Sequence, residues 1–285
     1  MPLGKITVFL EMIKFEHTIF ALPFVYMAVF LAEGQLIINH NLIWITLAMV
    51  GARTTAMSLN RIIDRYIDAE NPRTRSRALP KGLISLVEAW LYTIGFTALF
   101  IVSAYQLSPL AFKISPVCVL AFVFYSYTKR FTWLSHYVLG LTIGFAPLSA
   151  WIAISNAIDT GIVLLSLGVA LWVAGFDIIY ACDDFDFDRT TGLFSIPARF
   201  GVARALTVSA ITHVGAMVFF ILTGIILMLG VSYWIGLILA GILMFKQHAA
   251  ISPINLSKIN FAFFNLNGTL SIVMFLATIL DMGIR

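Results

Sequence analysis

Residues 161–182 read GIVLLSLGVALWVAGFDIIYAC, and Asp177 is the only charged side chain among them. About 20 apolar residues are enough for an α-helix to cross the hydrocarbon core of a bilayer. Comparable stretches recur on both sides of this one along almost the whole chain. Lipid satisfies no backbone hydrogen bond, so spanning segments of this length must be helices. The sequence therefore predicts an all-α, polytopic membrane protein.

Nine spans are expected in the 285 residues, of which 60% are hydrophobic and only 11% are charged. A soluble domain carries about 25% charged residues, so this chain has too few to cover a water-facing surface. No linker or soluble domain interrupts the spans, which predicts a single domain over residues 1–285 with the lipid bilayer as its partner. The spans lie near His17–Ala32, Leu42–Ile62, Ile84–Tyr105, Leu110–Tyr127, Leu134–Ser155, Gly161–Cys182, Leu206–Leu229, Tyr233–Phe245 and Leu266–Gly283.

The distribution of lysine and arginine predicts the orientation. With nine spans, the N-terminus and the loops after spans two, four, six and eight lie on one side of the membrane. Fifteen Lys and Arg residues fall there and two on the other side, while Arg53 lies inside span two. Cytoplasmic loops carry the excess of positive charge, which places the N-terminus and these loops on the cytoplasmic side of the inner membrane. The net charge of +4 then needs no nucleic-acid partner, and no obligate protein partner is evident.

Two longer cytoplasmic loops, residues 68–82 and 184–204, resemble each other in sequence. Each follows or contains a pair of aspartates and then a proline, a basic residue and a glycine in that order. The corresponding aspartates Asp64 and Asp184 are 184 − 64 = 120 residues apart, which is the length of four spans. This favours an internal repeat of two four-helix halves plus one extra helix, and such repeats are common in membrane proteins. Chance similarity between two polar loops is the alternative.

Acidic residues gather at the ends of spans two and six, where carboxylates repel one another and lose hydration unless cations neutralise them. Eight of the 14 acidic residues fall in these regions: Asp64, Asp68, Glu70, Asp177, Asp183, Asp184, Asp186 and Asp188. At about 100° per residue, an α-helix places Asn60, Asp64 and Asp68 on one face. Arg53 falls on the same stripe, deeper in the membrane.

The second acidic group has a related spacing. In span six, Asp177, Asp184 and Asp188 stand at offsets of zero, seven and eleven residues and lie within an arc of about 40°, whereas Asp183 and Asp186 point elsewhere. Two such faces offer hard oxygen ligands suited to Mg²⁺, which prefers one or two carboxylates together with phosphate oxygens. The pattern therefore indicates a magnesium site that accepts a phosphorylated substrate.

Basic residues adjoin both acidic groups. Cationic side chains beside metal-binding carboxylates indicate a diphosphate, whose remaining oxygens they would bind. The plainer interpretation is that these residues only set the topology and that the acids are solvated helix ends. The residues concerned are Arg65, Arg73, Arg75, Arg77, Lys81, Lys129, Arg130 and Arg199.

At these residues the chain resembles the UbiA-type intramembrane aromatic prenyltransferases, and the similarity covers essentially its whole length. Within that family it looks most like the 4-hydroxybenzoate polyprenyltransferases, whereas residues 14–18 (KFEHT) look like relatives that prenylate a dihydroxynaphthoate. The acceptor therefore stays open between these two. The matching stretches are Gly51-Ala52-Arg53, residues 60–68 (NRIIDRYID), Arg77-Ala78-Leu79-Pro80, residues 125–130 (YSYTKR), and Asp177 through Asp188 with Ser195-Ile196-Pro197.

The resemblance implies a helical bundle around a central cavity, capped by the two long loops and open sideways to lipid. It also implies a Mg²⁺–diphosphate complex whose metal ligands are Asn60, Asp64, Asp68, Asp184 and Asp188. Tyr180 stands four residues before Asp184, where a second asparagine would complete the symmetry. Equivalent metal binding by the two halves is therefore not expected.

The reaction implied is transfer of a polyprenyl group from its diphosphate to an aromatic acceptor, through an allylic cation, in quinone biosynthesis. Cationic residues would stabilise the leaving diphosphate, and aromatic faces the allylic cation. Asp177 either assists deprotonation of the acceptor or pairs with Arg53, and the pair is favoured. The expected substrate-binding residues are Arg53, Asn60, Arg77, Tyr125, Lys129, Arg130 and Tyr180, and the expected catalytic residues are Asp64, Asp68, Asp177, Asp184 and Asp188.

Two other kinds of function are compatible with the pattern. One is a prenyltransferase whose acceptor is haem, a chlorophyll precursor or a glyceryl phosphate lipid. The other is a membrane transporter of a phosphorylated substrate, in which intramembrane charge and internal repeats also occur. Transporters usually place their charges near the middle of the bilayer, whereas the acids here gather at the cytoplasmic ends of spans. That placement favours an enzyme.

Overall fold

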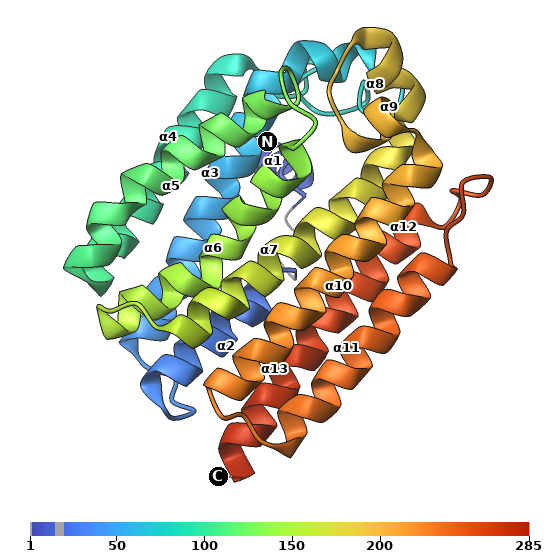
Figure 1. Cartoon of the computed structure of the whole chain (residues 1–285). Coiled ribbons are helices and arrows are strands. Elements are labelled where there is room, and N and C mark those ends of the chain that lie inside the picture. The colour runs from blue at the N-terminus through green and yellow to red at the C-terminus, as the bar shows by residue number, and fades with distance from the viewer. Residues whose placement is uncertain (1, 15–19, 285) are drawn as a thin grey trace. The chain divides into compact units, whose positions relative to one another are not determined.

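The structure, a computed structural model, describes residues 2–14 and 20–284, and every regular element in those ranges is a helix (Figure 1). The prediction of an all-α fold is therefore confirmed. The predicted start of the first span at His17, and most of the 14–18 stretch, lie outside the described residues. The helices are α1 (Pro2–Met12), α2 (Leu22–Glu33), α3 (His40–Glu70), α4 (Leu86–Leu107), α5 (Pro109–Thr128), α6 (Ser135–Ser155), α7 (Thr160–Ala181), the 3₁₀ turn η2 (Cys182–Asp184), α8 (Phe185–Thr191), α9 (Ile196–Phe200), α10 (Val202–Ile226), α11 (Val231–Ala249), α12 (Ile259–Phe261), the π-helical turn η3 (Ala262–Leu266) and α13 (Asn267–Ile284).

Each of the predicted spans two to nine coincides with one of the longer helices, and the described part of the first span coincides with the 12-residue helix α2. Among the described residues, 7 helical stretches are long and apolar enough to cross a membrane. The chain is therefore a multi-pass membrane protein. Helix α2 of the first span is shorter than these and α11 of the eighth is not among them, so the count of nine stays a prediction. The stretches are His40–Glu70, Leu86–Leu107, Pro109–Thr128, Ser135–Ser155, Thr160–Thr191, Val202–Ile226 and Ile259–Ile284.

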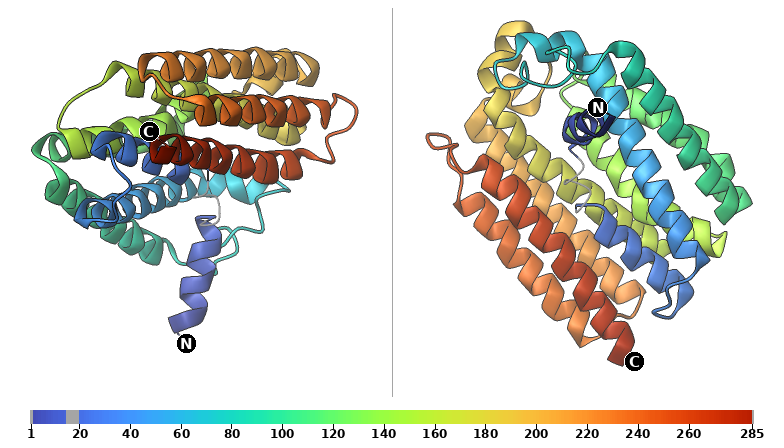
Figure 2. Two further views of the ribbon diagram at one scale, coloured as in Figure 1. Left: turned by 90° about the horizontal axis from the view of Figure 1, so that it is seen from below. Right: turned by 180° about the vertical axis from the view of Figure 1, so that it is seen from behind.

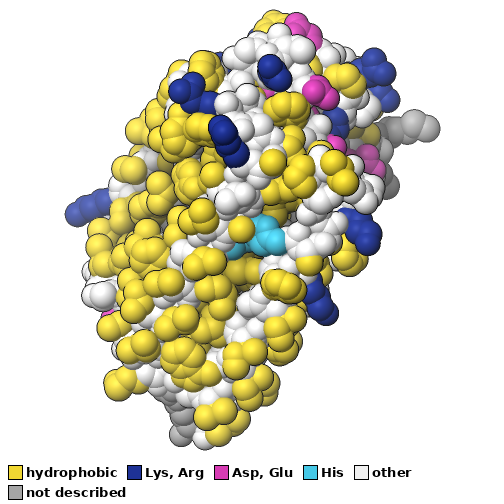
Figure 3. All heavy atoms as spheres, turned by 45° about the vertical axis from the view of Figure 1, so that its right-hand side comes forward, with side chains coloured by type: hydrophobic (Ala, Val, Ile, Leu, Met, Phe, Trp, Pro, Cys, Tyr) yellow, Lys and Arg dark blue, Asp and Glu magenta, His cyan; other side chains and the backbone are white. Residues whose placement is uncertain are grey.

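Large apolar side chains are exposed on many of these helices. Leu91, Leu120, Ile211 and Ile238 are 64%, 68%, 67% and 63% exposed. Figure 3 shows hydrophobic side chains over most of the face that it presents. A soluble monomer rarely exposes contiguous apolar surface on this scale. The outer faces of the helices are therefore suited to contact with lipid.

The contacts of the chain gather into two compact units. The first comprises Met1–Thr18 and Ile43–Tyr127, and it includes α1, α4 and most of α3 and α5. The second comprises Ile19–Leu42 and Thr128–Arg285, and it includes α2 and the helices from α6 to α13. Helix α2 packs on α6 and α13 within that second unit. The internal repeat and the single domain over residues 1–285 stay predictions.

In the first unit, the N-terminal helix packs against α3, α4 and the loop that joins them. Phe9 and Met12 of α1 are buried in a cluster that includes Ile62 of α3, and the ring of Phe9 lies 4.2 Å from that of Tyr92. Gly51 lets α3 approach α4 closely, because a Cβ atom there would lie 2.8 Å from the backbone nitrogen of Phe100. Close approach through small residues is typical of helices in membranes.

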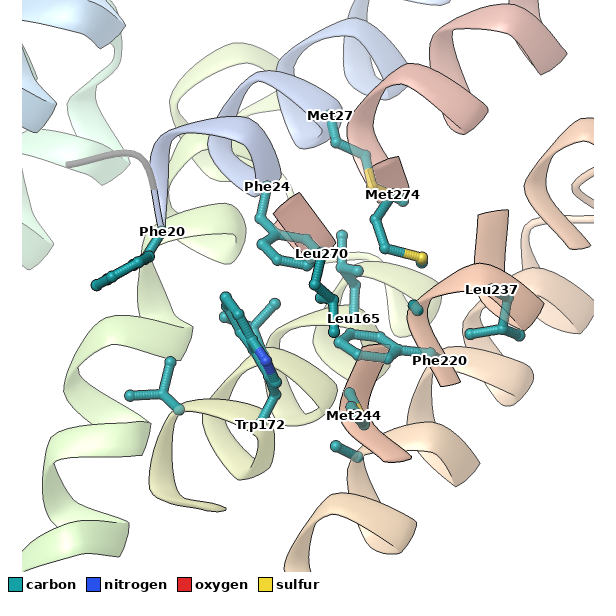
Figure 4. Close-up of a cluster of buried hydrophobic side chains, with 14 of the residues drawn as sticks. Phe20, Phe24, Met27, Leu165, Trp172, Phe220, Leu237, Met244, Leu270 and Met274 are labelled. Carbon is teal, nitrogen blue, oxygen red and sulfur yellow. The ribbon is translucent and has the colours of Figure 1, made fainter. Parts of the chain in front are cut away.

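Helix α7 is the most buried element of the second unit and packs on both α6 and α10. The helices α10, α11 and α13 run side by side, as the right-hand view of Figure 2 shows. Figure 4 shows Trp172 of α7 among Phe24, Phe220 and Leu270. The indole N–H of Trp172 donates to Oδ1 of Asn267 (3.0 Å). A buried tryptophan needs such a partner for its one polar atom.

Candidate active site

The first aspartate pair lies at the end of α3 in the first unit. The helix runs unbroken from His40 to Glu70, so Asn60, Asp64 and Asp68 follow one another at the predicted helical intervals. Asp64 and Asp68 are only 2% and 4% exposed. The side-chain amide of Asn60 donates to Oδ2 of Asp64 (3.1 Å). Burial of two carboxylates a turn apart is costly without compensating cations or donors.

Asp68 has one oxygen in an ion pair and one that suits a metal ion. Nη1 of Arg77, in the loop after α3, lies 2.7 Å from Oδ1 of Asp68. Thr74 in the same loop donates its hydroxyl to the backbone oxygen of Asp68 (3.1 Å). The second carboxylate oxygen of Asp68, Oδ2, is buried and has no hydrogen-bond partner among the described residues. A buried carboxylate oxygen without a donor is unfavourable, and a hard cation such as Mg²⁺ would satisfy it.

Arg61 orients Asn60, a role that the sequence did not suggest. This arginine is 7% exposed and donates from Nε to the carbonyl of Met12 (3.2 Å) and from Nη1 to Oδ1 of Asn60 (3.1 Å). Because arginine only donates hydrogen bonds, the atom of Asn60 that faces it must be the amide oxygen. That oxygen is then directed at Arg61 and the amide nitrogen at Asp64. Asn60, predicted as a metal ligand, thus orients Asp64 in this structure.

Arg53, one of the predicted substrate-binding residues, lies in the first unit together with Tyr125. Its Nη2 atom donates to the carbonyl of Lys14 (2.9 Å), just beyond α1. Tyr125 is half-buried on α5. Arg53 and Arg61 therefore both bind backbone oxygens at or after the end of the N-terminal helix. A contact of Arg53 or Tyr125 with substrate stays a prediction.

The second aspartate pair lies after α7 in the second unit, where the helix geometry differs from the expectation. Helix α7 ends at Ala181, and η2 (Cys182–Asp184) separates it from α8. A 3₁₀ turn rotates by about 120° per residue in place of about 100°. The prediction that Asp177 shares one continuous helical face with Asp184 and Asp188 is therefore wrong. Asp184 and Asp188 are half-buried.

The short loop before α9 contacts both Asp188, in α8, and Lys129, just after α5. Ser195 caps α9 by accepting from the backbone N–H of Ala198 (3.2 Å), and Leu193 donates its N–H to the backbone carbonyl of Asp188 (2.9 Å). The N–H of Phe194 donates to the carbonyl of Lys129 (2.8 Å). Lys129 is also an electrostatic neighbour of Asp188. The loop thus brings a predicted substrate-binding residue close to a predicted metal ligand.

Asp177 pairs with a histidine, His136, that the sequence did not suggest, and its expected pairing with Arg53 stays a prediction. Nδ1 of His136, in α6, lies 2.7 Å from Oδ2 of Asp177, in α7. The histidines of the chain show no metal-ligand spacing, so sequence reasoning missed the role of His136. The signal that points to it is a stripe of small residues in α6, because Gly140 and Gly144 follow His136 at intervals of four and let α6 approach α7.

Tyr180 and Arg130 are the remaining predicted site residues. The ring of Tyr180 packs 4.4 Å from that of Phe263, which meets Phe176 edge-to-face at 5.2 Å. Phe263 lies in η3, and π-helical turns occur often at functional sites. Arg130 is half-buried shortly after α5. Contacts of Tyr180 and Arg130 with substrate stay predictions.

These features define a polytopic helical membrane protein with buried or half-buried carboxylates at the ends of two of its helices. The UbiA prenyltransferase family model matches residues 21–277. The 4-hydroxybenzoate octaprenyltransferase of Aliivibrio fischeri (strain MJ11) is 32% identical over 225 residues, which are 77% of each chain. The protein of the same name from Aliivibrio salmonicida is 31% identical over 252 residues, 87% of this chain and 88% of its own. The chain belongs to the UbiA prenyltransferase family and is a prenyltransferase, as the sequence motifs predict.

Solved structures agree with this assignment. A UbiA homologue from Aeropyrum pernix K1, in its apo form, superposes with a TM-score of 0.84 and 34% identity, covering 94% of this chain and 98% of its own. A UbiA homologue from Archaeoglobus fulgidus bound to DMAPP and Mg²⁺ has a TM-score of 0.73 over 97% of this chain and 99% of its own. At 19% identity, the second likeness shows a shared fold.

Proposed function

We propose that this prenyltransferase transfers a polyprenyl group from a polyprenyl diphosphate to 4-hydroxybenzoate, with Mg²⁺ as its cofactor, in the biosynthesis of a quinone. Support for the donor and the acceptor comes from the curated relatives named 4-hydroxybenzoate octaprenyltransferase, at 31–32% identity over 77–87% of the chain. The observation that carries the metal is Asp68, whose buried carboxylate offers one oxygen to Arg77 and holds the other without a hydrogen-bond donor among the described residues.

The residues proposed to hold the metal are Asp64, Asp68, Asp184 and Asp188, all of them carboxylates and therefore suited to a hard cation. Bound Mg²⁺ would neutralise negative charge on the diphosphate and so make it a better leaving group. Asn60 orients Asp64 through the bond from its amide nitrogen.

Arg77, Lys129 and Arg130 are proposed to bind the oxygens of the diphosphate and to stabilise the charge that develops as the C–O bond breaks. Arg77 is suited to this because its guanidinium has five N–H donors. Its Nη1 atom contacts Asp68, which leaves other N–H groups to bind the diphosphate. Its side chain is 25% exposed, so part of the guanidinium is accessible to a ligand. Tyr125, Tyr180 and Arg53 are proposed to contact the substrates.

Asp177 is proposed to accept the phenolic proton of the acceptor. The ring carbon next to the phenolic carbon then forms a bond to the allylic carbon, and the electron pair of the broken C–O bond leaves with the diphosphate. Loss of the proton from that ring carbon to water restores the aromatic ring as a phenolate, which takes back the proton held by Asp177. The balance is one prenylated phenol, one diphosphate and one released proton.

Membership of the prenyltransferase family decides between the enzyme and the transporter in favour of the enzyme. The dihydroxynaphthoate, lipid and tetrapyrrole acceptors are the alternatives within the class. We further propose that the protein lies in the cytoplasmic membrane, with its N-terminus and its loops at residues 68–82 and 184–204 in the cytoplasm. The excess of lysine and arginine on that side supports this orientation.

The acceptor is tested by supplying purified protein in lipid nanodiscs with geranyl diphosphate, Mg²⁺ and one acceptor at a time. Prenylated 4-hydroxybenzoate, formed at least about 100-fold faster than prenylated dihydroxynaphthoate, is the expected result; a pocket built for one set of polar groups discriminates on this scale. The reverse preference would transfer the proposal to the dihydroxynaphthoate. Hydrolysis of the donor without a product from either acceptor would rule out both aromatic acids.

A further inference from the structure

Three backbone N–H groups in and just after the loop before α9 donate to three different parts of the second unit. Leu193 donates its N–H to the backbone carbonyl of Asp188 (2.9 Å), and Phe194 donates its N–H to the carbonyl of Lys129 (2.8 Å). Ile196 donates its N–H to Nε2 of His136 (3.3 Å). The loop of residues 192–196 therefore links Asp188 directly, and Asp177 through one imidazole ring.

The two hydrogen bonds of His136 fix which of its nitrogens carries the proton. A backbone N–H only donates, so Nε2 of His136 must accept from Ile196 and is unprotonated. In the neutral imidazole the proton is then on Nδ1, which donates to Oδ2 of Asp177 at 2.7 Å. Both nitrogens of His136 are occupied, and its side chain is only 6% exposed. The ring is therefore unsuited to take a proton from a substrate.

Asp177 is the accessible member of this pair. Its side chain is 23% exposed, against 6% for His136, so Asp177 is more open to a ligand than the imidazole ring is. Oδ2 of Asp177 is hydrogen-bonded to the imidazole, which restricts rotation of the carboxylate group about its Cβ–Cγ bond. The arrangement matches a general principle of enzyme sites, in which a reacting group is kept in place by a second residue behind it.

Close packing of two helices puts the histidine in this position. A Cβ atom on Gly140 would lie 2.2 Å from the carbonyl oxygen of Ala170, and one on Gly144 would lie 2.6 Å from that of Ser166. The backbones of α6 and α7 therefore touch along the stripe that begins with His136. Because His136, at the first position of that stripe, contacts Asp177 of α7, the pair depends on the packing of the two helices.

We propose that His136 is a positioning residue for prenyl transfer. Its ring orients the carboxylate of Asp177 toward the acceptor and links that carboxylate to the loop of residues 192–196, which contacts Asp188. This inference rests on the proposed function, since it assigns His136 to the reaction described above. A purely structural histidine would stabilise the fold without affecting the acceptor step. The two roles differ in what a substitution changes.

Two amide substitutions separate the two hydrogen bonds of the ring. In His136→Asn the amide nitrogen replaces Nδ1 and still donates to Asp177, whereas in His136→Gln the amide oxygen reaches the position of Nε2 and accepts from Ile196. His136→Ala removes both bonds. His40→Ala, an exposed histidine at the start of α3, serves as the matched control.

The expected result is a fall in kcat of about 10- to 100-fold for His136→Ala, the range typical of residues that orient a reacting group. The KM for geranyl diphosphate and its Mg²⁺-dependent binding without acceptor stay within about twofold, because the donor site keeps its ligands. His136→Asn recovers most of kcat and His136→Gln does not. The double variant His136→Ala/Asp177→Asn has a kcat no lower than that of Asp177→Asn alone, because both substitutions disrupt the same His136–Asp177 pair.

Wild-type kcat in His136→Ala, or a loss that multiplies with that of Asp177→Asn, would overturn the inference. A parallel loss of donor binding in His136→Ala would also overturn it and would assign the residue to the fold. The nitrogen chemical shifts of isotope-labelled His136 report the Nδ1–H form independently of turnover. If labelled His136 shows the Nδ1–H form but the protein transfers a prenyl group to no acceptor, the proposed function has failed while the pairing of His136 with Asp177 stands.

Discussion

The guanidinium of Arg77 lies 2.7 Å from the carboxylate of Asp68, nine residues earlier in the chain. One partner ends α3 and the other belongs to the loop that follows it. This pair, together with the bond from Thr74 to the backbone of Asp68, ties the loop to the end of the helix. The same carboxylate is proposed to bind Mg²⁺ through its other oxygen, so loop and metal meet at one residue.

Replacement of Arg77 by alanine is expected to raise the KM for geranyl diphosphate about tenfold and to lower the thermal midpoint in EDTA. Removing one partner of a buried ion pair leaves the other charge without compensation. Added Mg²⁺ is expected to raise the midpoint of Arg77→Ala more than that of the wild type, because it supplies the missing positive charge. Steady-state kinetics and thermal unfolding in detergent measure both effects.

Lys113→Ala, which removes an exposed cation on α5, provides the control for Arg77→Ala. Its KM and thermal midpoint are expected to equal those of the wild type. Equal KM values in Arg77→Ala and the wild type would show that Arg77 serves the loop alone and does not bind the donor.

Arg61 is expected to act on the metal through Asn60 and Asp64. Arg61→Ala frees the amide of Asn60 to turn, so the Mg²⁺ concentration for half-maximal rate should rise about tenfold, as is typical when support behind a metal ligand is lost. Asn60→Ala should give a similar rise, and the double variant should give no more than either single one. A titration of prenyl transfer with Mg²⁺ measures the three values.

Lys246→Ala, an exposed cation at the end of α11, is the control and should leave the Mg²⁺ titration unchanged. A rise in Asn60→Ala far above that in Arg61→Ala would contradict the orienting role. It would indicate that the oxygen of Asn60 binds the metal directly, as the family resemblance implies.

Gly140→Ala is expected to destabilise the protein by about 1–3 kcal/mol, the usual cost of overpacking a tight contact. The added Cβ would lie 2.2 Å from the carbonyl oxygen of Ala170, so α6 and α7 must separate. The same separation moves His136 away from Asp177, and kcat should fall as it does in His136→Ala. Thermal unfolding and kinetics of one preparation measure both.

Gly95→Ala is the matched control, because a Cβ atom at this position of α4 would meet nothing within 4 Å. Its stability should be unchanged or higher by up to about 1 kcal/mol, the helix propensity gained over glycine. Gly140→Ala with wild-type stability and kcat would contradict the assignment of the α6–α7 contact.

Much of the fold follows from features that repeat along the sequence. Apolar runs of membrane-spanning length predict each long helix, because length and hydropathy alone decide whether a segment suits lipid. The spacing of Asn60, Asp64 and Asp68 also predicts their register, since α3 continues regularly to Glu70. Regular helices allow such extrapolation over several turns.

Local irregularities of a helix and contacts between helices cannot be predicted from apolar length or helical spacing. The 3₁₀ turn at Cys182–Asp184 changes the angle around the helix axis between Asp177 and Asp188. The amino-acid composition of the turn does not predict it. The pairing of Asp177 with His136 joins residues 41 positions apart and depends on helix packing. A sequence-based search for glycines at intervals of four beside a histidine would have found that candidate.

The central claim is that buried aspartates bind Mg²⁺ for transfer of a prenyl group to 4-hydroxybenzoate. The most direct test compares Mg²⁺ titrations of this reaction for the wild type, Asp68→Asn and Asp186→Asn, the last an exposed acid of the second motif. We expect no transfer in EDTA, a loss of at least about 100-fold in Asp68→Asn and a wild-type rate in Asp186→Asn. Transfer that persists in EDTA, or equal rates in Asp68→Asn and the wild type, would contradict the account.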